Sequence, residues 1–450
     1  MVTVGSRAYR VGYSLVLMGF VVDLAYMTAA IATLPIWLVS MWIRGKLATD
    51  WAARFALRIP AALPREGQSH PRRPHILIHA VSVGEVNSVR LLADSLAAAP
   101  LFAAVTVSVT TDTGIARAKQ LFSDRHRVVR FPFDLSFSMG RFLRAVDPDL
   151  VLLTELEIWP NFTRICAERL IPVAVINGRL SARSFARSLR VRWFLSPMFR
   201  RLAHVCAQDA TYAERFAAMG VADDRITVTG TMKWDTAEIT DSVAGSEALA
   251  QELGVDRSKP LIVAGSTAPG EEALIHSACP SGVQLLCAPR KPEWFAAAAQ
   301  ALPGVVRRSS KQQGSTTGRF LLDTIGELRK AYALADVVVL GRTFGKLHGS
   351  DMMEPAALGR VVVIGPQVED FRATASALLD AGAIVQTTAE NLPATLAELL
   401  ADPARRKAIG SSAQRVVARE QGASLRHVQL ALRLIQEKFP DGATRSAAAR

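Results

Sequence analysis

The stretch HILIHAVSVGEVN, residues 75–87, is an apolar run that ends in a short Gly-containing turn, and residues 86–99 continue as a helix-like pattern. A strand that enters a helix through such a turn is typical of open α/β sheets, which bind ligands at the carboxyl ends of their strands. Glu85 lies at that end, so we expect a catalytic carboxylate there. The same residues also match a capping box, in which Glu85 would bond the amide of the N-cap residue Ser82. Taken alone, the capping box is the simpler interpretation.

Around this stretch, short apolar runs alternate with longer helical patterns, which predicts parallel sheets built from βαβ units. The expected strands fall into two series. The first comprises 75–81, 104–110, 149–153, 172–176, 203–207 and 226–229, and the second comprises 261–265, 284–288, 336–340, 361–364 and 383–386.

The 450 residues allow two or three domains. The polar stretch 233–260 separates the two series of strands and has the composition of a linker. We therefore expect two doubly wound domains with a cleft between them. The expected boundaries are an anchor and basic flank at 1–48, a first domain at 49–235, a linker at 236–260, a second domain at 261–425, and a terminal helix with a disordered tail at 426–450.

An apolar segment near the N-terminus predicts a membrane anchor. Residues 11–43 carry one charge, Asp23, and the 19 residues from Leu24 to Trp42 carry none. As a helix these would measure about 28 Å, close to the thickness of a hydrocarbon core. The basic residues that follow, Arg44, Lys46, Arg54 and Arg58, place the rest of the chain on the cytoplasmic side. Asp23 and Pro35 leave open whether the helix spans the membrane or lies in one leaflet.

The second series of strands is followed by loops suited to an anion. Residues 265–272 (GSTAPGEE) pass from a strand to a helix, residues 289–292 (PRKP) place two cations at a turn, and residues 326–328 (GEL) open a helix. Backbone amides at such positions can hold a phosphate, although for each loop alone a cap or a surface turn is the simpler interpretation.

Residues 341–357 (GRTFGKLHGSDMMEPAA) form a further strand, loop and helix pattern. The carboxylate of Glu354 could accept both hydroxyls of a ribose. The alternative is an acidic first-turn residue that complements the helix dipole beside a proline at the first helical position.

The net charge of +13 raises the question of nucleic acid. The interval 179–201 holds seven arginines and no acidic residue, with Phe185, Trp193 and Phe194 among them. Beside a membrane anchor, such a stretch suits acceptor phosphates or lipid headgroups, and a solvated basic helix is the alternative. Nothing else in the sequence resembles a nucleic-acid module, so we expect no nucleic-acid partner.

Taken together, the segments resemble the Kdo transferases, which move 3-deoxy-D-manno-octulosonate (Kdo) from CMP-Kdo to a lipid A precursor. The resemblance runs from about residue 37 to about residue 435. The matching segments are WIRG (42–45), SVGEV (82–86), TTDTG (110–114), ELEIWPN (155–161), NGRLSARS (177–184), GTMKWD (230–235), PRKP (289–292), DTIGEL (323–328) and EPAA (354–357).

This resemblance implies an inverting glycosyltransferase of GT-B architecture in lipopolysaccharide biosynthesis, attached to the cytoplasmic face of the inner membrane, with Glu85 as catalytic base. A nucleoside monophosphate donor lacks a diphosphate to chelate, and no metal-ligand spacing is present, so we expect no metal and no cofactor. The implied CMP-sugar site comprises Ser266, Thr267, Pro289, Arg290, Lys291, Gly326, Glu327, Leu328, Asp351 and Glu354. The implied acceptor side comprises Ser82, Gly84, Glu155, Glu157, Asn177, Arg179, Ser181, Arg183 and Lys233.

The donor half departs from the family pattern at positions where a histidine is usual. Ala268 and Lys291 stand at two of them, and His348-Gly349-Ser350-Asp351 replaces a usual G-G-H-N. Two alternatives therefore stay open: a GT-B transferase with another nucleotide-sugar donor, and a non-catalytic transferase-like protein that binds a membrane glycolipid. The retained Glu85 favours activity.

Overall fold

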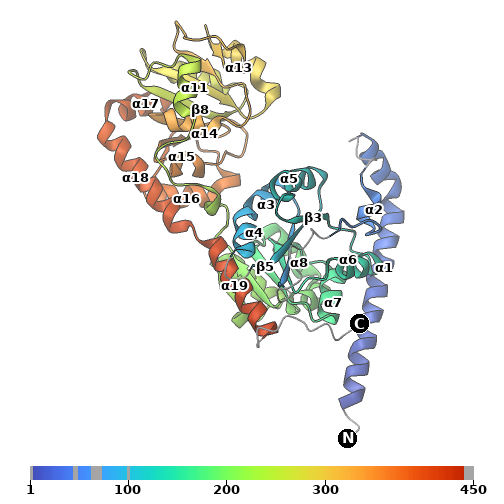
Figure 1. The fold of residues 1–450 in the computed structure, drawn as a ribbon. Helices are drawn as coiled ribbons and strands as arrows, with labels where there is room; N and C mark the ends of the chain where they lie inside the picture. The colour runs from blue at the N-terminus through green and yellow to red at the C-terminus, as the bar shows by residue number, and fades with distance from the viewer. Residues whose placement is uncertain (1–3, 44–48, 62–72, 99–101, 440–450) are drawn as a thin grey trace. The chain divides into compact units, whose positions relative to one another are not determined.

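The computed structural model describes residues 4–43, 49–61, 73–98 and 102–439, which form two compact units (Figure 1). The first unit lies within residues 1–236 and 422–450, and the second within residues 237–421. Each unit is built on a seven-stranded parallel sheet.

The sheet of the first unit has the order β3-β2-β1-β4-β5-β6-β7. The strands are β1 (His75–Ala80), β2 (Ala104–Val109), β3 (Arg127–Arg130), β4 (Leu150–Thr154), β5 (Val173–Gly178), β6 (His204–Ala207) and β7 (Ile226–Val228). In register, Ile76 faces Val105 on one side and Leu150 on the other. The chain order reverses between β1 and β4, which makes this boundary the topological switch point where open α/β sheets bind ligands.

Both faces of this sheet are covered by helices, as continuous apolar strands require. Alternate residues of β1 enter different cores: Ile76 and Ile78 pack with Leu92 and Leu96 on one face, and Leu77 packs on the other. The helices of this unit are α1 (Val4–Ile43), α2 (Trp51–Arg54), α3 (Val83–Ser88), α4 (Arg90–Ala97), α5 (Asp112–Phe122), α6 (Ser136–Val146), α7 (Pro160–Glu168), α8 (Ala182–Arg190), α9 (Arg192–Arg200), α10 (Ala210–Met219) and α19 (Ala423–Lys438).

The C-terminal helix α19 belongs to the first unit, where it packs against α4. The carboxylate of Asp235 holds its start, because it accepts hydrogen bonds from the amides of Gly422 and Ser424, each at 2.6 Å. The expected tail after residue 440 lies outside the described residues.

The sheet of the second unit has the order β10-β11-β9-β8-β12-β13-β14. The strands are β8 (Leu261–Thr267), β9 (Gln284–Pro289), β10 (Val306–Arg307), β11 (Arg319–Leu321), β12 (Val337–Leu340), β13 (Val361–Ile364) and β14 (Val385–Gln386). The helices are α11 (Ser246–Leu253), α12 (Glu271–Ala278), α13 (Phe295–Ala301), α14 (Leu328–Leu334), α15 (Met353–Ala357), α16 (Arg372–Asp380), α17 (Leu392–Ala401) and α18 (Pro403–Glu420). Helix α11 falls inside the stretch expected as a linker and packs against α14.

The switch point of the second sheet lies between β8 and β12. A Cβ atom on Gly341, directly after β12, would lie 2.3 Å from the Cα atom of Thr267. Only glycine allows this approach of two chain segments, which brings the loop after β12 against the end of β8.

Candidate active site

Glu85 lies in the first turn of α3, at the carboxyl end of β1. Ser82 is the N-cap residue: its Oγ accepts from the amide of Glu85 at 3.4 Å and donates to Glu85 Oε1 at 2.9 Å. The carboxylate of Glu85 reaches back to the amide of Val81 at 2.9 Å, one residue before the amide that the capping box predicts. A variant of the capping box is therefore present, and Gly84, exposed in the same turn, leaves the carboxylate half-exposed.

A hydrogen bond from the neighbouring strand β4 also holds the carboxylate. The hydroxyl of Thr154 lies 2.6 Å from Glu85 Oε2 and 2.8 Å from the backbone carbonyl of His79. Thr154 is fully buried, and it is a site residue that the sequence analysis missed. Its position directly before the ELEIWPN segment is the signal that could have identified it.

Two further carboxylates follow β4 on the other side of the switch point. Burial raises the pKa of Glu155, and the negative charge of Glu85 raises it further, although Arg179 and Lys233 oppose this shift. Burial and then the Glu85 charge raise the pKa of Glu157 to about 7, against a hydrogen bond from Trp159 Nε1 at 3.0 Å. Glu85, Glu155 and Glu157 therefore share one electrostatic environment at the switch point.

The other expected acceptor residues lie at the same edge of the sheet, after β5 and β7. Asn177 is buried, with a φ of 52°, and its side-chain oxygen accepts from the amide of Met232 at 3.1 Å. This bond ties the end of β5 to the segment that carries Lys233, whose side chain is exposed. Asn177 thus supports this edge of the sheet from inside the protein.

Two exposed arginines and a helix cap complete that edge. Arg179 is exposed directly after β5, and its Nε donates to the Tyr212 hydroxyl at 3.4 Å. Ser181 caps α8 by accepting from the amide of Ser184, and Arg183 is exposed in the first turn of that helix. The following basic interval forms α8 and α9, where Trp193 is 81% exposed.

The expected donor residues gather at the corresponding edge of the second unit. Ser266 and Thr267 end β8, and the hydroxyl of Thr267 donates to Glu272 Oε1 at 2.5 Å. Pro289 ends β9 and is followed by the exposed Arg290 and Lys291. Lys291 pairs with Glu293 at 3.4 Å, and its Nζ lies 5.0 Å from the centre of the Trp294 ring.

The loop after β11 adds Gly326, Glu327 and Leu328, where Glu327 is the N-cap residue and Leu328 begins α14. Gly326 has a φ of 94°, which favours glycine. Burial opposes ionisation of Glu327, but hydrogen bonds from Thr324 at 2.6 Å and Arg308 at 3.2 Å outweigh it and lower the pKa. This carboxylate is occupied in supporting the loop.

Asp351 and Glu354 follow β12. Asp351 accepts from the amide of Met353 at 2.9 Å, and burial raises the pKa of Glu354 although Arg329 opposes the shift. Helix α15 begins at Met353, so the expected opening at Glu354-Pro355 is wrong by one residue, and Pro355 is not at the first helical position.

The buried carboxylate of Glu271 holds together the edge of the second sheet where the expected donor residues lie. The sequence analysis did not name this residue. It accepts from the amides of Ala268 at 2.9 Å, Arg342 at 2.6 Å and Phe344 at 3.2 Å. It therefore fixes the loops after β8 and β12 against each other. Among residues 4–43, 49–61, 73–98 and 102–439, no group of His, Cys, Asp and Glu is arranged to hold a metal ion.

Comparison with known proteins adds the following. Residues 49–236 match the family model described as 3-deoxy-D-manno-octulosonic-acid transferase (kdotransferase). The chain is 30% identical over 375 residues to the 3-deoxy-D-manno-octulosonic acid transferase of Haemophilus influenzae, covering 80% of this chain and 87% of that protein. It is 31% identical over 414 residues to the enzyme of the same name from Bordetella pertussis, covering 87% and 94%.

Among solved structures, the UDP-GlcNAc 2-epimerase of Neisseria meningitidis bound to UDP-GlcNAc matches with a TM-score of 0.54 and 12% identity, over 80% of this chain and 100% of that one. At this identity the match concerns the fold alone. It confirms the expected architecture of two parallel-sheet α/β domains.

Proposed function

This chain belongs to the 3-deoxy-D-manno-octulosonic acid transferase family and is a glycosyltransferase of lipopolysaccharide biosynthesis, and we propose that Glu85 is the base with which it transfers Kdo from CMP-Kdo to a lipid A precursor. The assignment of Glu85 as the base rests on the position of its carboxylate in the first sheet. A half-exposed carboxylate stands at the switch point of the first sheet, held by hydrogen bonds from Val81, Ser82 and Thr154.

The chemistry requires such a group. A hydroxyl of the lipid acceptor is a weak nucleophile, so Glu85 takes its proton while the oxygen attacks the anomeric carbon of Kdo. The bond from that carbon to the phosphate of CMP breaks, and CMP leaves with the bonding electron pair. Attack on the face opposite the leaving group inverts the anomeric carbon.

The residues at the donor edge suit the departing phosphate. Arg290 and Lys291 are exposed cations, and the backbone amides at Gly326 and Glu327 precede α14. Groups that stabilise the charge developing on the phosphate lower the barrier. The acceptor carries phosphates of its own, for which Arg179 and Arg183 are suited because a guanidinium binds phosphate bidentately.

We place the enzyme at the inner membrane, with both units on the cytoplasmic face. The support is α1, of which Gly19–Ile43 is long and apolar enough to cross a membrane by length and composition. The basic residues on its C-terminal side favour this orientation.

The test of Glu85 is its replacement by glutamine in the full chain. Kdo transfer from enzymatically generated CMP-Kdo to a tetraacylated lipid A precursor is followed by mass spectrometry in the presence of EDTA. We expect Glu85→Gln to lower kcat by roughly 10²–10⁴-fold, since that is the usual contribution of a general base. The matched control is Asp124→Asn, which removes an exposed carboxylate after the last turn of α5.

Turnover of Glu85→Gln within twofold of the wild type, with the melting temperature unchanged, would overturn the role of Glu85. Replacement of CMP-Kdo by UDP-sugars in the same assay separates the proposed donor from the alternative one. Transfer from a UDP-sugar but not from CMP-Kdo would overturn the proposed identity of the donor. It would leave the fold and the role of Glu85 as base unaffected.

A further inference from the structure

The N-terminal helix α1 is attached to the rest of the first unit through partly buried polar side chains. Asp23 Oδ1 accepts from the amide of Ser136 at 3.0 Å and from Asn161 Nδ2 at 2.8 Å. The Tyr26 hydroxyl donates to Asp134 at 3.3 Å, and Asp134 itself accepts from the first amides of α7. Hydrocarbon around this attachment would have to accommodate several polar side chains, at a large cost in free energy.

Helix α1 contacts the rest of the first unit again near its C-terminal end. The rings of Trp37 and Trp51 are in edge-to-face contact, with 5.6 Å between their centres. From Trp51 a series of aromatic contacts continues through Phe133 and Phe55 to Phe137 on α6. Aromatic rings of this kind are typical of the interface between water and membrane.

The part of α1 between these two attachments is too short to cross a bilayer. Residues 27–36, between Tyr26 and Trp37, are exposed at every position, and as a helix they measure about 15 Å, against about 30 Å of hydrocarbon. Beyond Ile43 the chain rejoins the first unit at Thr49, whose hydroxyl donates to Asp112 at 3.1 Å. The five residues 44–48 reach at most about 18 Å and cannot return across a membrane.

The exposed surface of α1 from Phe20 to Ile43 is nevertheless largely apolar. The exposed fractions of Phe20, Ile31, Ile36, Trp42 and Ile43 are 65, 72, 75, 72 and 72%. The sequence carries basic residues at both ends of the apolar segment, Arg7 and Arg10 before it and Arg44 and Lys46 after it. Basic residues at both ends fit a helix whose two ends face the same, cytoplasmic side.

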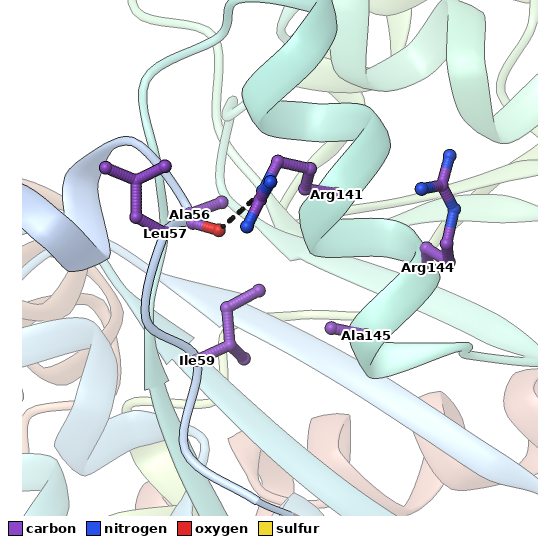
Figure 2. A pocket seen from close by; sticks show the side chains of 6 residues that line it. All are labelled: Ala56, Leu57, Ile59, Arg141, Arg144 and Ala145. Carbon is purple, nitrogen blue, oxygen red and sulfur yellow. Dashed lines mark hydrogen bonds between the residues drawn. The ribbon is translucent and has the colours of Figure 1, made fainter.

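A basic pocket lies on the elements that the aromatic series connects to α1. It has a volume of about 440 Å³ and lies between residues 56–59, which follow α2, and helix α6 (Figure 2). Leu57 and Ile59 line one wall, and Arg141, Arg144 and Ala145 line the other. Arg141 Nε donates to the carbonyl of Ala56 at 3.1 Å, which orients the guanidinium, and the exposed Arg58 beside the pocket pairs with Asp50 at 2.7 Å.

We propose that α1 does not span the bilayer but lies in the plane of its cytoplasmic leaflet, and that the pocket of Arg141 and Arg144 receives the phosphate of an anionic phospholipid headgroup. This inference rests on the proposed membrane attachment. The exposed apolar side of α1 enters the acyl region, while Asp23 and Tyr26 keep their contacts with the first unit outside it. The partner is an anionic lipid surface, because an exposed apolar helix together with exposed arginines of the same unit matches that chemistry.

Labelling of single cysteines tests the orientation. Ser6→Cys and Ala48→Cys are each introduced into the full chain, after replacement of the native Cys166, Cys206, Cys279 and Cys287 by Ala or Ser with transferase activity retained. Everted inner-membrane vesicles are then treated with a membrane-impermeant maleimide. We expect both cysteines to react to the same extent before and after detergent is added. Reaction of Ser6→Cys only after detergent would show that α1 spans and would overturn the proposal.

The lipid specificity is tested with vesicles of phosphatidylcholine with and without 30% phosphatidylglycerol. We expect the anionic lipid to strengthen binding of the wild type, and Arg141→Ala/Arg144→Ala to remove at least half of that gain. The matched control, Arg415→Ala/Arg419→Ala, removes two exposed arginines of α18 in the second unit. An equal loss of this gain in the control would overturn the proposed role of the pocket in binding lipid. Competition of millimolar inorganic phosphate with vesicle binding would also overturn it, because it would indicate a site for the free ion.

Lipid binding and labelling are both measured without substrate, so they test the inference independently of catalysis by Glu85. Recovery of the wild-type chain in the soluble fraction after carbonate washing would overturn both this inference and the proposed attachment. Activity of that soluble chain would leave the assignment of Glu85 intact, so the two failures are distinguishable.

Discussion

Thr154 supports both protonation states of Glu85 that the proposed reaction passes through. While Glu85 is a carboxylate, the Thr154 hydroxyl can donate to it at 2.6 Å. Once Glu85 has taken a proton, the same hydroxyl can turn to the carbonyl of His79 at 2.8 Å. In each arrangement the Thr154 hydroxyl has an acceptor within hydrogen-bond distance, so we expect it to hold the side chain of Glu85 in place throughout the reaction.

We therefore expect Thr154→Val to lower kcat by about tenfold with KM for both substrates changed less than twofold, since loss of one hydrogen bond to a charged group costs about 1.5 kcal/mol. Thr154→Ser should restore most of the activity, because it keeps the hydroxyl and loses only a methyl group. Steady-state kinetics of the two variants beside the wild type checks this. Equal activity of the Val and Ser variants would contradict the positioning role.

Glu157 makes the stability of the first unit depend on pH. Burial and the nearby Glu85 raise its pKa from an ordinary value of 4.5 to about 7. Below pH 4.5 the group is protonated in both the folded and the unfolded chain. As the pH rises toward 7 the unfolded chain releases the proton first, so the folded state loses stability, and the full loss is present above pH 7.

Glu157→Gln should therefore raise the free energy of unfolding at pH 8 by about 1–2 kcal/mol and change it little at pH 4.5. Urea unfolding at the two pH values measures this difference, and Asp124→Asn is the control for removal of an exposed carboxylate. The same gain at both pH values would show that ionisation of Glu157 is not its cause.

The C-terminal helix α19 depends on one capping carboxylate that lies far from it in the sequence. Asp235, the last residue of the GTMKWD segment, accepts from the amides of Gly422 and Ser424. Leu430 and Leu434 of α19 belong to the core that includes Ile76 and Ile78 of β1. The aspartate of the GTMKWD segment therefore has a structural role, as the cap of α19.

Removal of the cap in Asp235→Ala should destabilise the first unit by about 2 kcal/mol, the upper range for a helix cap. Hydrogen exchange should become faster in α19 and stay unchanged in α18, which peptide-level mass spectrometry resolves. The control, Asp224→Ala, removes an exposed aspartate from the same unit. Equal protection of α19 in both variants would contradict the capping role.

The sequence alone predicted most strands, because long apolar runs bounded by turns are unambiguous. It missed β3, β10 and β11, which have two to four residues and in β3 carry arginine at both ends. Short strands of this kind are stabilised by pairing with a neighbouring strand, as β3 pairs with β2. The local hydrophobic pattern of the sequence does not predict such pairing. Thr154 was missed for the same reason, since its partner Glu85 lies 69 residues away.

The two units repeat one arrangement, in which chain order reverses at β1 and β4 in the first sheet and at β8 and β12 in the second. The alternation of strands and helices predicted parallel sheets but not this order, because helices that cross to either face produce the same sequence pattern. The order matters for the site, since it places Glu85 beside Glu155 and Thr267 beside Gly341. Each unit thereby has its own switch point, where open α/β sheets bind ligands, and the proposed function assigns the acceptor to the first unit and the donor to the second.

The assignment of one substrate to each unit predicts that substitution of donor-site residues weakens CMP binding, whereas substitution of the catalytic base does not. Arg290→Ala/Lys291→Ala should weaken binding of CMP by about five- to tenfold, as expected for the loss of exposed charge contacts with one phosphate. Glu85→Gln should bind CMP as the wild type does, because its carboxylate belongs to the first unit. Isothermal titration of the full chains with CMP measures both, and Lys311→Ala, an exposed lysine of the second unit, is the charge control. If Glu85→Gln weakened CMP binding as much as the double variant did, the base would contribute to the donor site, and the assignment of one substrate to each unit would be wrong.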